Sequence, residues 1–142
     1  MASDLSAVMQ QDHEALGSFV KGDPEPKKKL YSRRDDATLA NPLGPPARGW
    51  RQIEQTLEHA SSILHDGELL GFDRISEGAS GDLAYIVEIE RYRVRAGDAE
   101  QVGPSTLRVT TVFRREDGEW KIAHRHADTI VTSQPAETVM DH

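Results

Sequence analysis

The residues best suited to chemistry lie near the end of the chain, where histidine and acid side chains alternate. In residues 119–132, His124, His126 and Asp128 are spaced two apart. Because the side chains of a strand alternate between its two faces, this spacing places all three on one face. An imidazole titrates near neutral pH, so His126 is the predicted catalytic acid or base, and Asp128 is placed to orient it.

Charged partners of both signs occur on the two strands predicted before this segment. Alternation assigns the following residues to the same wall: Glu88, Glu90, Arg108 and Thr110. A face that is apolar at one end and polar at the other indicates the wall of a half-open cavity. In this cavity Glu88 is the second candidate to orient His126. Arg108 or Thr110 would stabilise a developing negative charge.

The residues predicted to contact the ligand are Arg108, Thr110, His124, Glu90, Trp50 and Asn41. An arginine cannot lose its charge, so Arg108 would need Glu88 or Glu90 as a partner. A ligand carboxylate would displace that acid and bind Arg108 in a two-pronged contact. The predicted partner is therefore a small organic molecule that carries a carboxylate or a carbonyl group.

Three interpretations of these residues stay open. As an enzyme site, they would isomerise, dehydrate or cyclise a small carbonyl compound without a cofactor. Alternatively, they satisfy one another as a buried ion-pair network, in a non-catalytic module that binds a ligand or forms oligomers. His124, His126 and Asp128 could also ligate zinc or iron, but a third well-placed histidine is missing, so no metal site is predicted.

The elements that position these residues follow from the spacing of apolar residues. Helical periodicity predicts three helices: one ending near Gly22, one from Asp23 to about Tyr31, and one from Trp50 to Asp66. β-Branched and aromatic residues predict a short strand at 37–41 and long strands at 68–76, 83–95, 105–115 and 119–132. Helices followed by hairpin-linked strands indicate an α+β fold with an antiparallel sheet.

Composition narrows the class of protein. The 142 residues fit one domain, assigned to residues 1–132 and followed by a loose tail at 133–142. The net charge of −7 argues against nucleic acid or a membrane surface as partner, and the basic residues between 27 and 34 are interpreted as a solvated helix face. No cysteine and no long apolar stretch are present, so we expect a cytoplasmic protein without disulfides or membrane spans.

Several strings of the sequence resemble known families. DATLANPLG (residues 36–44) is similar to the stretch around the catalytic base of ketosteroid isomerases. LRVT (107–110), FRREDGEWKI (113–122) and HRH (124–126) resemble SnoaL-like domains and the association domain of calcium/calmodulin-dependent protein kinase II. The order of elements resembles the nuclear transport factor 2 fold over residues 4–131. This resemblance implies a cone-shaped, curled antiparallel sheet packed on three N-terminal helices.

The resemblance does not carry steroid isomerase activity to this chain. The base of those isomerases is an aspartate just before the proline, where this chain has Asn41. Their oxyanion-hole tyrosine falls near Gly17, without a tyrosine nearby, and their oxyanion-hole acid falls at Thr110. An amide cannot accept the proton, and a hydroxyl is a weaker donor than a neutral carboxyl.

The outer face of the predicted sheet indicates self-association. Alternation places on it Tyr85, Val87, Ile89, Val109, Thr111 and Phe113. An apolar strip of this size is unfavourable in water, so we expect a homodimer that buries it.

Overall fold

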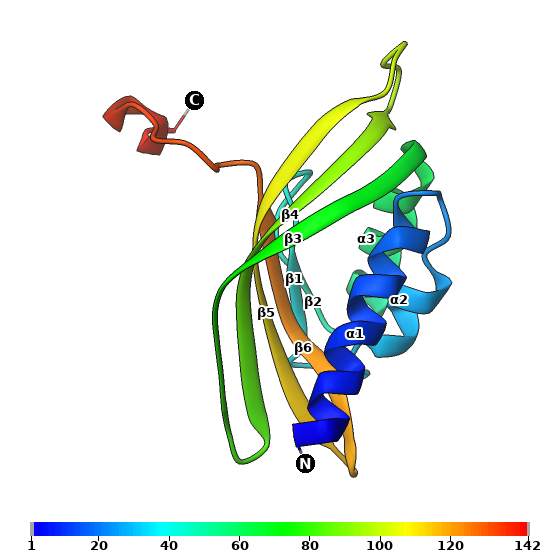
Figure 1. Cartoon of the computed structure of the whole chain (residues 1–142), viewed down its shortest axis with the longest axis vertical. Coiled ribbons are helices and arrows are strands. Elements are labelled where there is room, and N and C mark those ends of the chain that lie inside the picture. Colours follow the sequence, from blue (N-terminus) through cyan, green and yellow to red (C-terminus); the bar gives the residue numbers. More distant parts are fainter. Residues whose placement is uncertain (1, 142) are drawn as a thin grey trace.

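A computed structural model describes residues 2–141, which form three α-helices and a six-stranded sheet (Figure 1). The helices are α1 (Ala2–Phe19), α2 (Glu25–Leu30) and α3 (Trp50–Ser62). The strands are β1 (Thr38–Ala40), β2 (Ala47–Arg48), β3 (Leu64–Ser80), β4 (Leu83–Ala96), β5 (Gly103–Glu116) and β6 (Glu119–Asp128). Within the described part of the chain, no helix has the length and apolarity needed to cross a bilayer.

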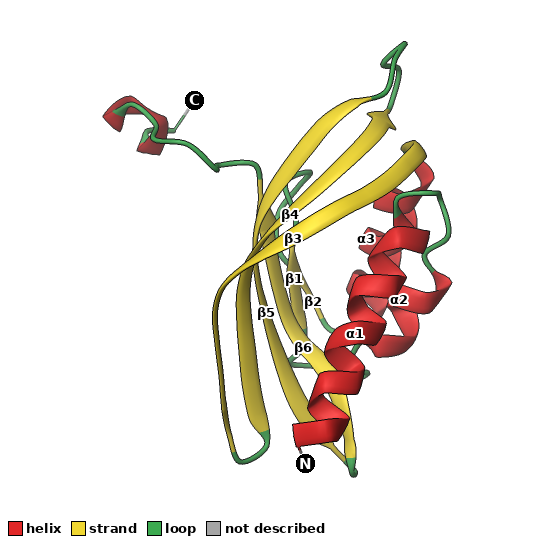
Figure 2. Cartoon of the chain, viewed as in Figure 1, coloured by secondary structure: helices red, strands yellow, loops and turns green. Residues whose placement is uncertain are grey.

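The strands lie in the order β2-β1-β6-β5-β4-β3 and form a curled sheet that is not closed. Three register shifts along the β3–β4 pair help to bend it, since each extra residue kinks its strand. The helices lie on the concave side (Figure 2). The predicted α+β fold with a cone-shaped sheet on three helices is confirmed. The sheet is mixed, however, because β1 runs parallel to β6. Strand β2 lies between the predicted strand at 37–41 and the predicted helix from Trp50, where no strand was predicted.

The hydrophobic core fills the space between the helices and the concave face. Its fully buried members include Tyr31, Ile53, Ile86, Phe113 and Ile122. The helix predicted to begin at Trp50 buries one face, at Ile53, Leu57 and Ala60. The helix nevertheless ends at Ser62, short of the predicted Asp66, because Leu64 already begins the long strand β3. The helical spacing of apolar residues continues beyond Ser62 in the sequence, but in the structure these residues belong to a strand.

One glycine sets how closely α1 and β3 approach. A Cβ atom at Gly67 would overlap the carbonyl oxygen of Val20 and would lie 2.6 Å from the carbonyl carbon of the same residue. Only glycine leaves room for this backbone-to-backbone contact. It joins the end of α1 to the start of β3, at the end of the molecule where the β4–β5 hairpin also lies (Figure 1).

The tail predicted from residue 133 onward continues from the end of β6 and projects away from the sheet (Figure 1). It carries a short 3-10 helix, η1 (Ala136–Val139), in which no residue is buried. Val139 and Met140 are both largely exposed.

Candidate functional site

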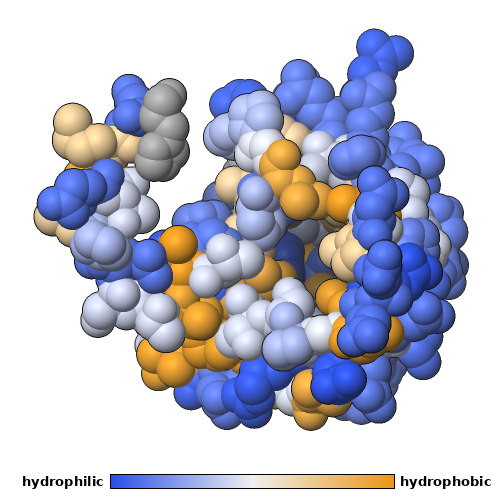
Figure 3. All heavy atoms as spheres, turned by 90° about the horizontal axis from the view of Figure 1, so that it is seen from above, coloured by the Kyte–Doolittle hydropathy of each residue, from blue (hydrophilic) through white to orange (hydrophobic). Residues whose placement is uncertain are grey.

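A cavity of about 510 Å³ lies between the helices and the concave face of the sheet. Its wall is mostly apolar and comes from α1, α3, the 41–43 loop and the sheet, including Leu16, Phe19, Val20, Leu39, Leu57, Ile63, Leu64, Val94, Leu107 and Ala127. The view from above shows a hollow with hydrophobic residues at its edge (Figure 3). Volume and lining are typical of a site for a small organic ligand.

Arg125 on β6 and Tyr92 on β4 are among the polar residues that line this mostly apolar cavity, and they share a buried partner. Arg125 reaches across β5 to Glu90, donating from Nη1 to Oε2 at 3.0 Å and from Nη2 to Oε1 at 2.8 Å. The Tyr92 hydroxyl donates to Oε1 of Glu90 at 2.6 Å. Glu90 is fully buried and does not itself line the cavity, so it supports Arg125 and Tyr92 from behind the cavity wall.

This arrangement keeps Glu90 ionised. Burial works against the carboxylate and is the largest single influence, but the charge and hydrogen bonds of Arg125, with help from Lys27 and Tyr92, lower the pKa of Glu90 to about 2. Burial, followed by the nearby charge of Glu90, raises the pKa of Tyr92 well above its ordinary value. At neutral pH the site therefore holds a charged arginine, a carboxylate and a neutral phenol.

A second buried ion pair lies close behind the first. Lys27 of α2 contacts Asp12 of α1, and both are almost completely buried. Burial lowers the pKa of Lys27, while the charge of Asp12 raises it. The expectation that the basic residues near position 27 form a solvated face is therefore wrong for Lys27. Among the described residues, Oδ2 of Asp12 and the Tyr31 hydroxyl are buried without a hydrogen-bond partner.

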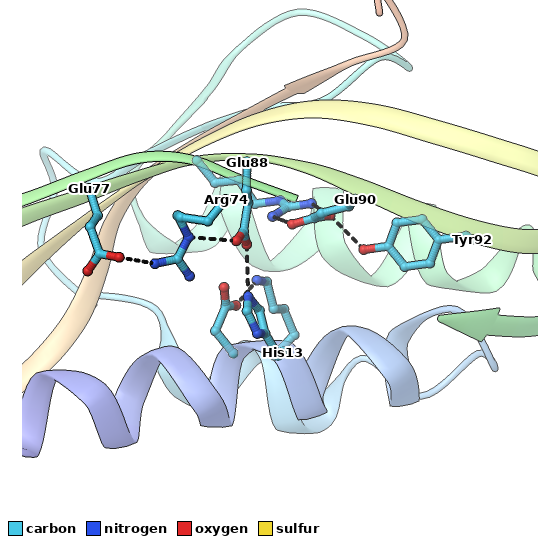
Figure 4. Close-up of polar contacts among 9 residues, drawn as sticks. His13, Arg74, Glu77, Glu88, Glu90 and Tyr92 are labelled. Carbon is cyan, nitrogen blue, oxygen red and sulfur yellow. Dashed lines mark hydrogen bonds and ion pairs between the residues drawn. The ribbon is translucent and has the colours of Figure 1, made fainter. Parts of the chain in front are cut away.

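Glu88, predicted to be catalytic, belongs to a separate network on the same face. It is fully buried and is 2.9 Å from Nε2 of His13 on α1, and it accepts from Nε of Arg74 on β3 at 3.0 Å. Figure 4 shows His13 pointing from α1 toward Glu88, with Arg74 bridging to Glu77. The His13 ring stacks on Phe72 at a centroid distance of 3.4 Å. None of these residues lines the cavity, so the network joins α1 to the sheet.

The other predicted catalytic residues lie on the outer face of the sheet, away from the cavity. Arg108 donates two hydrogen bonds to the Asp128 carboxylate, of 3.0 and 2.7 Å. Nε2 of His126 lies 3.2 Å from Oδ2 of Asp128. Side-chain exposures of 53% for Arg108 and 48% for His126 show that both face outward. Thr110 is the cross-strand partner of His126 and shares that face. His124 contacts the Thr38 hydroxyl at 2.8 Å.

The predicted constellation is therefore wrong in its placement, and a β-bulge explains part of the error. Val112 is paired with His124 and Phe113 with Ile122, so Ala123 is an extra residue in β6. The bulge reverses the alternation. Trp120 and Ile122 are buried in the core, but after Ala123 it is Arg125 and Ala127 that are buried and point inward.

The two faces of strand β5 are also the reverse of the prediction, although the extra residue lies in β6 and not in β5. Its inward residues are Val109, Thr111 and Phe113, which are fully buried and were predicted on the outer face. Arg108 and Thr110 do share one face with His126 and Asp128, as predicted. That face is the outer face of the sheet, which also carries Ile89 and Val87. Only Glu88 and Glu90 of the predicted polar set face the helices. The predicted pairing of Arg108 with these glutamates does not occur.

The two remaining ligand-contact predictions have different outcomes. Asn41 lines the cavity, next to Pro42 and Leu43, and also borders a second, more open hollow of about 440 Å³ against α3. Trp50 does not line the cavity; its ring is covered by Arg33, with the guanidinium carbon 3.4 Å from the ring centroid. Within residues 2–141, no group of three or more histidine or acid side chains is arranged to hold a metal ion.

Comparison with known proteins supports the fold. A candidate dehydratase of the nuclear transport factor 2-like family from Streptomyces avermitilis has 17% identity and a TM-score of 0.74, with 92% of this chain and 96% of that chain covered. A ketosteroid isomerase-like protein from Erwinia carotovora atroseptica has 17% identity and a TM-score of 0.74, with 93% and 100% covered. A candidate calcium/calmodulin-dependent protein kinase II association domain from Xanthomonas campestris has 19% identity and a TM-score of 0.70, with 94% and 90% covered.

At these identities the likeness establishes a shared fold only. No curated protein shows significant sequence similarity to the chain. The model of the SnoaL-like domain family, however, matches residues 28–132, which include Arg125, Glu90 and Tyr92. The cavity, the cone-shaped sheet and this match agree, and the chain belongs to the SnoaL-like domain family.

Proposed function

We propose that the protein binds a small, largely apolar organic molecule with one polar group, such as a carbonyl or a hydroxyl, in the cavity between helices and sheet. The observation that carries the proposal is the apolar cavity of about 510 Å³ with Arg125 and Tyr92 in its wall. Ligand pockets of about 300–1,000 Å³ commonly combine apolar walls with a few polar groups that fix the ligand's orientation. The Arg125 guanidinium supplies the donor for that polar group.

Binding is better supported than cofactor-free isomerisation, dehydration or cyclisation. Arg125 stays charged at any ordinary pH, and Tyr92 already donates its proton to Glu90. Glu90 is fully buried behind them, and no histidine or carboxylate occurs among the described residues that line the cavity. A general base must come within hydrogen-bond reach of the proton that it removes. The cavity is thus equipped to hold and orient a ligand more than to move its protons.

Calorimetric titration with 2-octanone and 2-decanone tests the proposal. Each buried methylene contributes about 0.8 kcal/mol, so the longer ketone should bind roughly tenfold more tightly. Leu107→Trp, which fills the cavity, should abolish binding. Leu70→Trp, at an exposed position outside the cavity, is the matched control and should bind like the wild type. Binding that is unchanged in Leu107→Trp, or absent from the wild type, would contradict the proposal.

We also propose that the protein is a homodimer. The outer sheet face carries Tyr85, Val87, Ile89 and Val112 side by side, and none of them is fully buried in the single chain. Covering this patch with a second copy would remove apolar surface from water. Light scattering should give a dimer for the wild type and a monomer for Val87→Glu, while Gln55→Glu on α3 should remain a dimer. A monomeric wild type at micromolar concentration would refute the idea.

A further inference from the structure

We propose that Glu90 makes the cavity selective for uncharged ligands, because it occupies the two terminal nitrogens of Arg125 that a ligand carboxylate would otherwise bind. This inference rests on the proposed function and adds the charge class of the ligand. The ligand it specifies has a neutral hydrogen-bond acceptor, such as an amide, ketone or ester, on an apolar body. Its ionised acid counterpart is rejected.

The geometry of the pair leaves no room for a second carboxylate in the same role. Arginine binds a carboxylate through two parallel N–H donors, and Glu90 already receives this bidentate contact at 3.0 and 2.8 Å. Tyr92 holds Glu90 in place through a further hydrogen bond of 2.6 Å. Glu90 is completely buried, so a ligand acid that displaced it would leave a carboxylate buried and unpaired. A buried charge that loses its partner is strongly destabilising.

The charge balance around the cavity gives the same result. The charges of Arg125 and Glu90 cancel, and Lys27, the one other buried cation that the described residues place near them, is paired with Asp12. An anion entering the cavity would therefore meet no uncompensated positive charge and would lose its hydration. A neutral acceptor needs a single donor. A guanidinium has five N–H groups, and Glu90 takes two of them.

A matched pair of probes tests the selectivity in the wild type. Decanamide and decanoate share chain length and differ in charge at neutral pH. Calorimetry should show decanamide binding at least about tenfold more tightly. As the pH falls toward 4, decanoate becomes the neutral acid, and its affinity should rise toward that of the amide. Glu90, with its pKa of about 2, stays ionised over this range, so the change reports the charge of the ligand.

Glu90→Gln tests the residue itself. The amide keeps the shape of the side chain but no longer neutralises Arg125, so decanoate affinity should rise at least about tenfold, with decanamide affinity changed less than about threefold. Glu88→Gln is the matched control: it lies two residues away on the same strand and face, is equally buried, and pairs with His13 and Arg74 outside the cavity. It should keep the wild-type preference.

The outcomes separate this inference from the proposed function. If the wild type binds decanoate and decanamide equally, or if folded Glu90→Gln binds decanamide without gaining decanoate, the selectivity is refuted and the binding function stands. If the wild type binds neither decanamide nor 2-decanone, the binding function and the selectivity fall together. If Glu90→Gln does not fold, the wild-type comparison of the two probes and its pH dependence still decide the question.

Discussion

Replacement of Gly67 by alanine should separate α1 from β3 at the end of the molecule next to the cavity. The new Cβ atom would overlap the carbonyl oxygen of Val20 and lie 2.6 Å from its carbonyl carbon and from its Cβ atom. Carbon atoms pack at about 3.5–4.0 Å, so the two backbones must move apart by roughly 1 Å. Because the obstacle is backbone, no side-chain rotation relieves it.

The expected loss of stability follows from this overlap. Overpacking of an interior contact costs about 1–3 kcal/mol, and a clash with backbone belongs at the upper end. Alanine recovers about 0.4–1 kcal/mol by restricting the unfolded chain, so the net loss should be about 2 kcal/mol. For a domain of this length, that lowers Tm by roughly 5–10 °C. Val20 also lines the cavity, so the affinity for 2-decanone should fall as well.

Urea unfolding followed by circular dichroism measures this loss, with Gly71→Ala as the matched control. Gly71 also lies in β3, but its added Cβ would meet only Nη2 of Arg91, at 3.4 Å, the end of a flexible side chain. Gly71→Ala should stay within about 0.5 kcal/mol of the wild type. Equal stability of Gly67→Ala and the wild type would refute the reasoning about the α1–β3 contact.

Two further predictions concern the ion pairs on opposite faces of the sheet. Because the pKa of Glu90 is lowered from 4.5 to about 2, its contribution to stability is fully present above pH 4.5 and is lost as the pH falls toward 2. Urea unfolding between these pH values should show a loss of unfolding free energy that Glu90→Gln lacks. Arg108→Leu and His126→Ala, on the outer face, should change the affinity for 2-decanone less than about twofold by calorimetry, and a tenfold loss would place them at the site.

The sequence predicts the fold far better than the site. Long amphipathic and β-rich segments carry their own periodicity, so α3 and the four long strands are found close to their observed positions. β2, which has two residues, has too few side chains to show a pattern. The parallel pairing of β1 with β6 joins distant parts of the chain, and no local signal encodes it.

The site depends on which face each residue occupies, and one extra residue changes that. Alternation from Trp120 and Ile122 predicts that His124 and His126 face inward, whereas the bulge at Ala123 turns Arg125 inward. A bulge has no fixed sequence signature, so the error carries through the rest of the strand. One feature of the sequence does indicate that Arg125 faces inward: Ala123 and Ala127, two residues before and after it, have small side chains that suit a crowded interior position.

The pairing of β1 with β6 has a consequence for how the protein is made. Thr38 pairs with His124, and β2 pairs with β1 at the edge of the sheet, so neither short strand has its place in the sheet until residues 124–126 have been synthesised. Before then the β3–β4–β5 meander exposes the unpaired edge of β5, a template for association between nascent chains. Folding must therefore be completed after translation of β6.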